Sequence, residues 1–115
     1  MTETAYWLAI SCWPGIGSRR ALYLKQHLGT GEAIWQADAT TLQEILGLRP
    51  EAISKMVRQR QTQDPEAMLE RVRQAGAWVL SFADDTYPAT MRQLFDPPIV
   101  ILGWGKPLMG HARSL

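Results

Sequence analysis

The sequence is poor in the residues that build disulfides and metal centres. It has one cysteine, Cys12, and two histidines, His27 and His111, among 115 residues. A single cysteine excludes an intrachain disulfide and any metal site made of several cysteines, and it fits a reducing, cytoplasmic setting. Because Cys12 lies inside an apolar stretch, we expect it to be a small buried residue. The sequence predicts no cofactor and no metal site.

A strong charge of either sign is also missing. Twelve Lys and Arg stand against 11 Asp and Glu, which gives a net charge of +1. The chain as a whole is therefore not a polyanion binder, and any contact with nucleic acid must be local. Residues 1–60 carry seven basic and five acidic side chains, so an anion-binding surface is expected in that half. Ordinary solvated helix faces explain the same bias equally well.

Long hydrophobic runs are absent too. No apolar run approaches the ~18 residues that a membrane span needs, and no basic region precedes the apolar stretch at the N-terminus. Neither a membrane span nor a secretory signal is predicted. The content of 46% hydrophobic and 20% charged residues is that of a globular protein.

Helical periodicity dominates residues 1–62. Helices are expected over residues 5–11, 19–28, 32–36, from Thr40 or Thr41 to residue 46, and over 51–61 with Pro50 at the first helical position. Ser18 is the expected N-cap of the second helix, and Gly29 and Gly47 are expected helix ends. This half predicts an all-helical module.

The pattern changes beyond residue 62. Asp64 and Pro65 begin a helix expected over residues 65–75. The β-forming runs 78–82 and 99–102 flank a short helix expected over 89–95, and the second run is apolar without alternation, as in a strand covered on both faces. This order predicts two parallel strands that open an α/β sheet. We expect a helical module over residues 1–62 and an incomplete α/β domain over 63–115, the fold class being α+β or α/β.

The most specific motif is WPGIGSRRA at residues 13–21. Two glycines around an isoleucine, then a polar residue and a second helix, are typical of a helix–hairpin–helix. The glycines permit positive φ, and the N–H groups that open the helix face outward at its positive end, where a phosphate oxygen fits. The candidate DNA phosphate site comprises Gly15, Gly17, Ser18, Arg19, Arg20 and Lys25.

A degenerate second hairpin occupies residues 42–53. Leu46-Gly47-Leu48 replaces the two-glycine turn, and the charge of Glu51 disfavours phosphate there. The hairpins are expected to pack around Leu8, Ile16, Leu24, Leu28, Ile45, Leu48 and Ile53. Such a pair also serves as a packing or protein-docking device, so phosphate binding and docking are both hypotheses.

Other residues carry weaker signals. The adjacent Asp84 and Asp85 could suggest a metal site, but turn chemistry is the commoner role of such a pair. Packing in the core or at an interface is expected for Trp7, Trp13, Trp35 and Trp78, and base stacking is the alternative for any of them that is exposed. No nucleophile–base pair and no nucleotide-binding glycine loop can be placed, so the sequence predicts no enzymatic activity.

Taken together, these motifs resemble the DNA-processing protein A family (DprA, also called Smf). The resemblance rests on LAISCWPGIGSRRALYLKQHLG at residues 8–29, the degenerate hairpin, and the run from Tyr87-Pro88 through Leu94 to DPPIVILG at residues 96–103. It covers essentially residues 5–108. It implies the N-terminal part of such a protein: a SAM-like helical module followed by the first strands of a Rossmann-like domain.

The resemblance also implies a function. Members of this family bind single-stranded DNA and help to load the RecA recombinase during natural transformation. It implies a cytoplasmic, non-enzymatic protein that is a possible homo-oligomer with no membrane partner. The family's Gly-Ser-Arg motif would follow Leu115, so DNA binding is expected mainly outside this chain. The alternative is a protein-docking module without DNA binding of its own.

Overall fold

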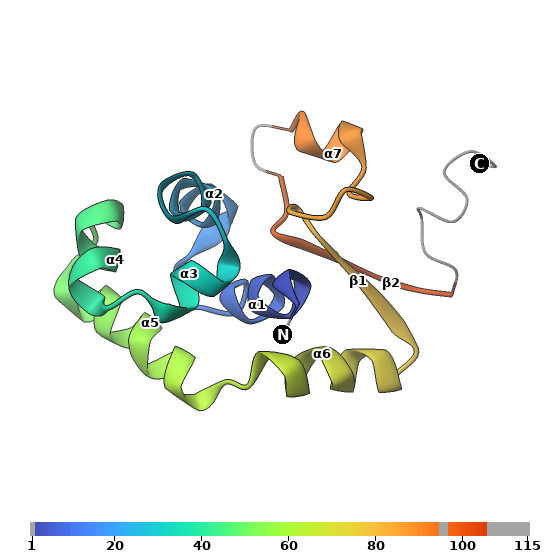
Figure 1. Cartoon of the computed structure of the whole chain (residues 1–115), viewed down its shortest axis with the longest axis horizontal. Coiled ribbons are helices and arrows are strands. Elements are labelled where there is room, and N and C mark those ends of the chain that lie inside the picture. The colour runs from blue at the N-terminus through green and yellow to red at the C-terminus, as the bar shows by residue number, and fades with distance from the viewer. Residues whose placement is uncertain (1, 95–96, 106–115) are drawn as a thin grey trace.

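The chain folds as helices followed by a small sheet in the computed structural model, which describes residues 2–94 and 97–105 (Figure 1). The elements are α1 (Glu3–Ile10), α2 (Gly17–Leu28), α3 (Gly31–Gln36), α4 (Ala39–Leu46), α5 (Pro50–Thr62), α6 (Pro65–Gln74), β1 (Ala77–Ser81), α7 (Ala89–Arg92) and β2 (Val100–Trp104). The predicted all-helical first half is confirmed, and the mainly helical chain with its two-stranded sheet fits the α+β class.

Local signals in the sequence account for most helix ends. Asp64 caps α6 by accepting the Ala67 N–H at 3.3 Å, and Gly47 ends α4 in the left-handed conformation. The first four helices begin one or two residues earlier than predicted, and two of these starts change the role of a residue. Asp38, rather than a threonine, caps α4, and α2 begins one residue before Ser18, so that Ser18 lies inside the first turn.

Helix α1 is the central element of the fold. Every residue from Ala5 to Ile10 is buried. A helix that is apolar on all sides must be covered on all sides, and α1 contacts α3, α6 and β1 (Figure 1). The Glu3 carboxylate fixes one of these contacts, because it accepts the Gly31 N–H at 2.8 Å at the start of α3. Helix α1 therefore connects the helical half to the sheet.

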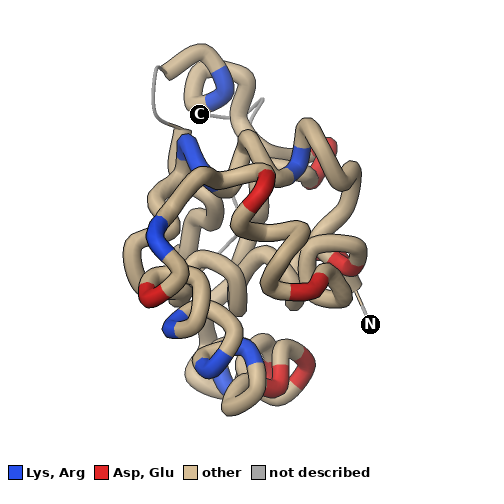
Figure 2. The backbone as a smooth tube through the Cα atoms, turned by 90° about the vertical axis from the view of Figure 1, so that its left-hand side faces the viewer, with Lys and Arg blue, Asp and Glu red and all other residues tan. Residues whose placement is uncertain are grey.

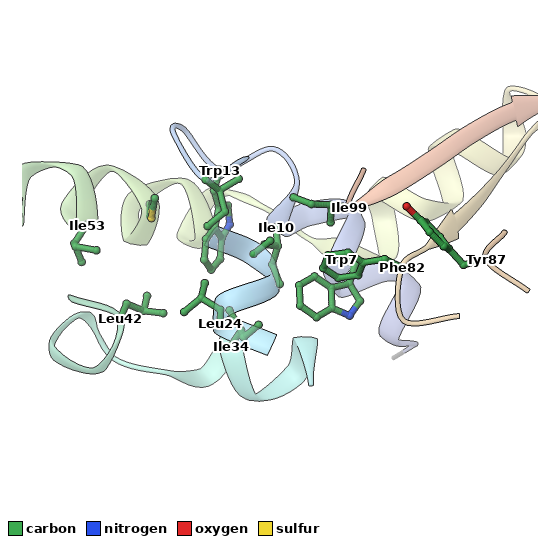
Figure 3. Close-up of a cluster of buried hydrophobic side chains, with 13 residues drawn as sticks. Trp7, Ile10, Trp13, Leu24, Ile34, Leu42, Ile53, Phe82, Tyr87 and Ile99 are labelled. Atoms are coloured by element: carbon green, nitrogen blue, oxygen red, sulfur yellow. The ribbon is translucent and has the colours of Figure 1, made fainter. Parts of the chain in front are cut away.

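The main core joins both halves of the chain (Figure 3). Its buried residues are Trp7, Ile10, Trp13, Ile16, Ala21, Leu24, Ile34, Leu42, Ile53, Met56, Phe82, Tyr87 and Ile99. Of the residues expected between the hairpins, all but Leu8 belong to this core or pack against it. Leu8 lies instead in a smaller cluster with Ala5 and Leu69.

The two strands are antiparallel, and the predicted parallel arrangement is wrong. Ser81 pairs with Val100 and Ala77 with Trp104, so β2 returns alongside β1. A parallel return would have to run back along the full length of β1, about 17 Å for five residues. Among the described residues of the connecting segment, the helix is the four-residue α7, about 6 Å long, which is too short for a crossover helix.

Strand β2 is not covered on both faces, contrary to expectation. Leu102 and Trp104 are 48% and 68% exposed. On the opposite face, the Trp78 ring lies across Gly103, its partner in the sheet, and a Cβ added to Gly103 would overlap the indole. One face of β2 is thus filled by an aromatic ring from β1, and the other is partly open.

Candidate nucleic-acid interface

The first hairpin turn has the backbone conformation that its glycines predict. Gly15 and Gly17 have φ of +74° and +58°, and open space surrounds the position of a Cβ at each. Ile16 is 2% exposed and belongs to the main core. The isoleucine therefore anchors the turn while the glycines leave its backbone open to close approach.

A shallow depression lies beside this turn. It is lined by Ile16, Gly17, Ser18, Arg19, Arg20, Tyr23 and Leu46. Four of the predicted site residues are thus brought together at the start of α2. We call this surface the hairpin depression. Its lining combines main chain, two guanidinium side chains, an aromatic ring and an aliphatic contribution from α4.

Arg20 has a structural contact at this surface. Its guanidinium donates to the Gly15 carbonyl oxygen at 3.1 Å, which braces the turn against α2. The Arg20 side chain is nevertheless exposed. A guanidinium has five N–H donors, so this contact leaves donors for a phosphate oxygen.

Lys25 lies elsewhere. It lines a separate hollow with Leu22, Phe82, Arg92 and Pro97, two helical turns beyond the hairpin. The structure therefore brings Arg19 and Arg20 to the hairpin depression but not Lys25.

Tyr23 also lines the hairpin depression, although it is not among the site residues predicted from the sequence. It is 46% exposed and lies one helical turn beyond Arg19. The signal that could have found it is the spacing of four residues between Arg19, Tyr23 and His27, which places all three on one side of α2.

The second hairpin offers a different surface. Gly47 has φ of +67°, as the turn requires. Arg49 and Glu51, both exposed, flank Pro50 at the start of α5. The carboxylate of Glu51 occupies the first turn of that helix, where it competes with an incoming anion.

Charges of both signs are interspersed over the face that presents α2, α4 and α5 (Figure 2). One basic residue of that half, Arg60, turns inward and donates to the Ile34 and Ala37 carbonyl oxygens at 3.2 and 2.6 Å. Burial lowers the pKa of Arg60, while the charge of Asp38 partly opposes that shift. Arg60 therefore serves the end of α3 and not a binding surface.

Asp84 has the turn role expected for it. Its carboxylate accepts the Ser81 N–H at 2.6 Å and the Thr4 hydroxyl at 3.2 Å, which ties the end of β1 to α1. Among residues 2–94 and 97–105, no cluster of three His, Cys, Asp or Glu could hold a metal ion. Within the same residues, no helix is long and apolar enough to cross a membrane.

An apolar groove lies on the other side of the molecule. It is lined by Leu8, Cys12, Met68, Arg71, Val72, Ala75, Ala77, Leu102 and Trp104. We call it the α6–β2 groove. Cys12 is exposed here, so its predicted burial is wrong. The reason is that α1 ends at Ile10 and Trp13, rather than Cys12, turns into the core.

The helices between residues 3 and 62 thus include two pairs joined by glycine-containing turns, and the first of these turns is open and lies beside two arginines. In sequence, the chain is 32% identical over 113 residues to Protein Smf from Synechocystis sp. (strain PCC 6803). This match confirms the resemblance to the DprA/Smf family. It covers 98% of the chain but only 28% of that relative, which is consistent with correspondence to an N-terminal part. No family model and no solved structure matches the chain.

Proposed function

We propose that the helical module contacts the DNA backbone through the hairpin depression and acts by binding rather than by catalysis. The observation that carries the proposal is the open Gly15–Gly17 turn, anchored by Ile16, beside the exposed Arg19 and Arg20. Main-chain N–H groups and guanidinium groups are the usual donors to phosphate, and such contacts position DNA without reading its sequence.

The similarity to Protein Smf supports a wider proposal for the complete protein. That protein would process DNA during natural transformation, bind single-stranded DNA, and assist loading of the RecA recombinase. The chain spans 28% of the length of its relative, so most of these contacts would be made outside it. The hairpin depression would add an auxiliary phosphate contact in the cytoplasm.

A salt series tests the auxiliary contact. Two or three phosphate contacts predict a slope of log K against log salt of about −2 to −3 for duplex DNA, and slightly less for single strands. The measurement is fluorescence anisotropy of a labelled oligonucleotide at low and moderate salt. No binding even at low salt would refute the proposal.

Gly17→Val is the variant that removes the contact. A β-branched side chain at φ of +58° strains the turn and covers its open backbone. Gly76→Val imposes a comparable strain at φ of +89°, just beyond α6 and outside the hairpin depression, and is the matched control. We expect loss of DNA binding in the first variant only, with circular dichroism showing that both still fold. Equal losses would attribute the effect to destabilisation.

The alternative function is protein docking. The α6–β2 groove favours it, because nearly all its lining is apolar and Trp104 is 68% exposed. Exposed apolar patches of this kind mark interaction sites. We propose a second copy of the chain as its occupant, since β2 also offers an edge without a strand neighbour among the described residues.

A further inference from the structure

The exposed side of α2 carries an aromatic pair that the phosphate contact does not use. Tyr23 and His27 have ring centroids 4.3 Å apart with their planes at 59°. His27 Nδ1 donates to the Tyr23 carbonyl oxygen at 3.0 Å, since that oxygen can only accept. Both side chains are exposed. The pair is therefore held together by local contacts while it faces solvent.

This pair continues directly from the hairpin depression. Tyr23 lines the depression together with Arg19, and it also lines an adjoining hollow with Arg19, Leu22 and Gln26. Arg19, Tyr23 and His27 are spaced by four residues and span about 12 Å along the helix axis. That length matches three to four stacked nucleotides at about 3.4 Å each.

We propose that Tyr23, supported by His27, is a nucleobase-stacking platform that gives the hairpin depression a preference for unpaired strands. The inference rests on the proposed function, because the phosphate contact would deliver the strand to the ring. Aromatic side chains stack on the faces of unpaired bases, whereas the bases of a duplex are already stacked on one another. Arg19 lies one helical turn from Tyr23, where its guanidinium can bind the phosphate that follows the stacked base.

Stacking predicts a dependence on bases and not only on phosphates. Tyr23→Ala should weaken binding of a labelled single-stranded oligonucleotide by about five- to tenfold. The same substitution should leave binding unchanged for an abasic oligonucleotide of equal length, which keeps the phosphates but has no rings to stack. Tyr23→Phe keeps the ring and should bind as wild type does.

The experiment uses the full chain and fluorescence anisotropy at one low salt concentration, with single-stranded, duplex and abasic probes. Leu94→Ala is the control, since Leu94 is 51% exposed and lies beyond α7, outside the depression. A second readout is photocross-linking of an oligonucleotide that carries 5-iodouracil, which should attach at Tyr23.

Each outcome decides between the two proposals. A loss confined to the base-containing single strand supports the platform. An equal loss on the abasic probe, or no loss at all, overturns the platform while leaving phosphate binding intact. Absence of salt-dependent binding by the wild type overturns the proposed function, and the platform with it.

Discussion

The Tyr87 side chain closes the loop between the two strands. It is 3% exposed, and its hydroxyl donates to the Pro98 carbonyl oxygen at 2.8 Å. The Arg92 guanidinium lies 5.0 Å from the centre of the ring and donates to the Phe82 carbonyl oxygen at 2.7 Å. The Tyr-Pro and Pro-Pro pairs that carry much of the family resemblance are thus joined by a hydrogen bond within the fold.

Replacing Tyr87 by Phe should lower the free energy of unfolding by about 1 kcal/mol, because the Pro98 carbonyl loses its donor while the ring stays packed. Urea unfolding followed by circular dichroism measures this. Thr86→Ala, at an exposed neighbouring position, is the control and should change stability by less than about 0.5 kcal/mol. Equal effects in both variants would argue against the closing role of the hydroxyl.

The same hydroxyl predicts a dependence on alkaline pH. Burial raises the pKa of Tyr87, although the charge of Arg92 opposes the shift. Since the folded-state pKa lies above the unfolded value of about 10, the stabilisation is complete below that pH and is lost as the pH rises through the folded-state value. The melting temperature should fall less steeply above about pH 10 in Tyr87→Phe. The melting temperature of Tyr87→Phe should still fall somewhat above that pH, because burial also raises the pKa of Tyr6. Parallel pH curves for the two proteins would contradict the assignment.

At the scale of elements, the short helix α3 depends on two side chains from elsewhere. The Glu3 carboxylate accepts hydrogen bonds from the first N–H groups of α3, and the Arg60 guanidinium donates to the carbonyl oxygens at its end. A helix of six residues has little stability of its own. These contacts from α1 and α5 therefore hold α3 in place.

Arg60→Ala should cost about 1–3 kcal/mol, because it leaves two carbonyl groups without their charged donor. Arg73→Ala removes the same charge from an exposed position on α6 and should stay within about 0.5 kcal/mol of wild type. Thermal and urea unfolding of the two variants measure the difference. A loss in Arg60→Ala no larger than that in Arg73→Ala would show that the end of α3 does not need this contact.

The helices could be predicted because their signals are local. Pro50 and Pro65 open helices, and Gly29 and Gly47 end them, without help from distant residues. Local signals could not predict whether the two strands are parallel or antiparallel. That arrangement depends on whether the segment after Phe82 can cross the sheet, and therefore on the actual length of α7.

The candidate site was predictable in its backbone and less so in its side chains. The identity of Gly15 and Gly17 predicts their backbone conformation, since few other residues adopt positive φ. Lys25 lies six residues beyond Arg19, on another side of α2, where it lines the hollow with Arg92 and Pro97. The exposure of Tyr23 depends on α4, which contributes only Leu46 to that surface.

For the whole molecule, the α6–β2 groove and the edge of β2 predict self-association. An edge strand with exposed apolar side chains pairs readily with another chain. Sedimentation velocity over a range of concentrations should show a dimer that weakens in Trp104→Ser and in Leu102→Ser. Leu94→Ser changes a residue of similar exposure outside the groove and should leave the dimer intact. A strict monomer at high concentration would refute this prediction.

The indole of Trp78 lying across Gly103 has a consequence for how such a sheet could grow. Sliding β2 by one residue would bring a side chain, from Leu102 or Trp104, to the place that only glycine can occupy under the ring. The Trp78 ring excludes any side chain at the position of Gly103, so the two strands can pair in only one register. A strand that pairs with the edge of β2, from another copy or from further chain, would therefore meet a strand whose two side-chain faces are already fixed.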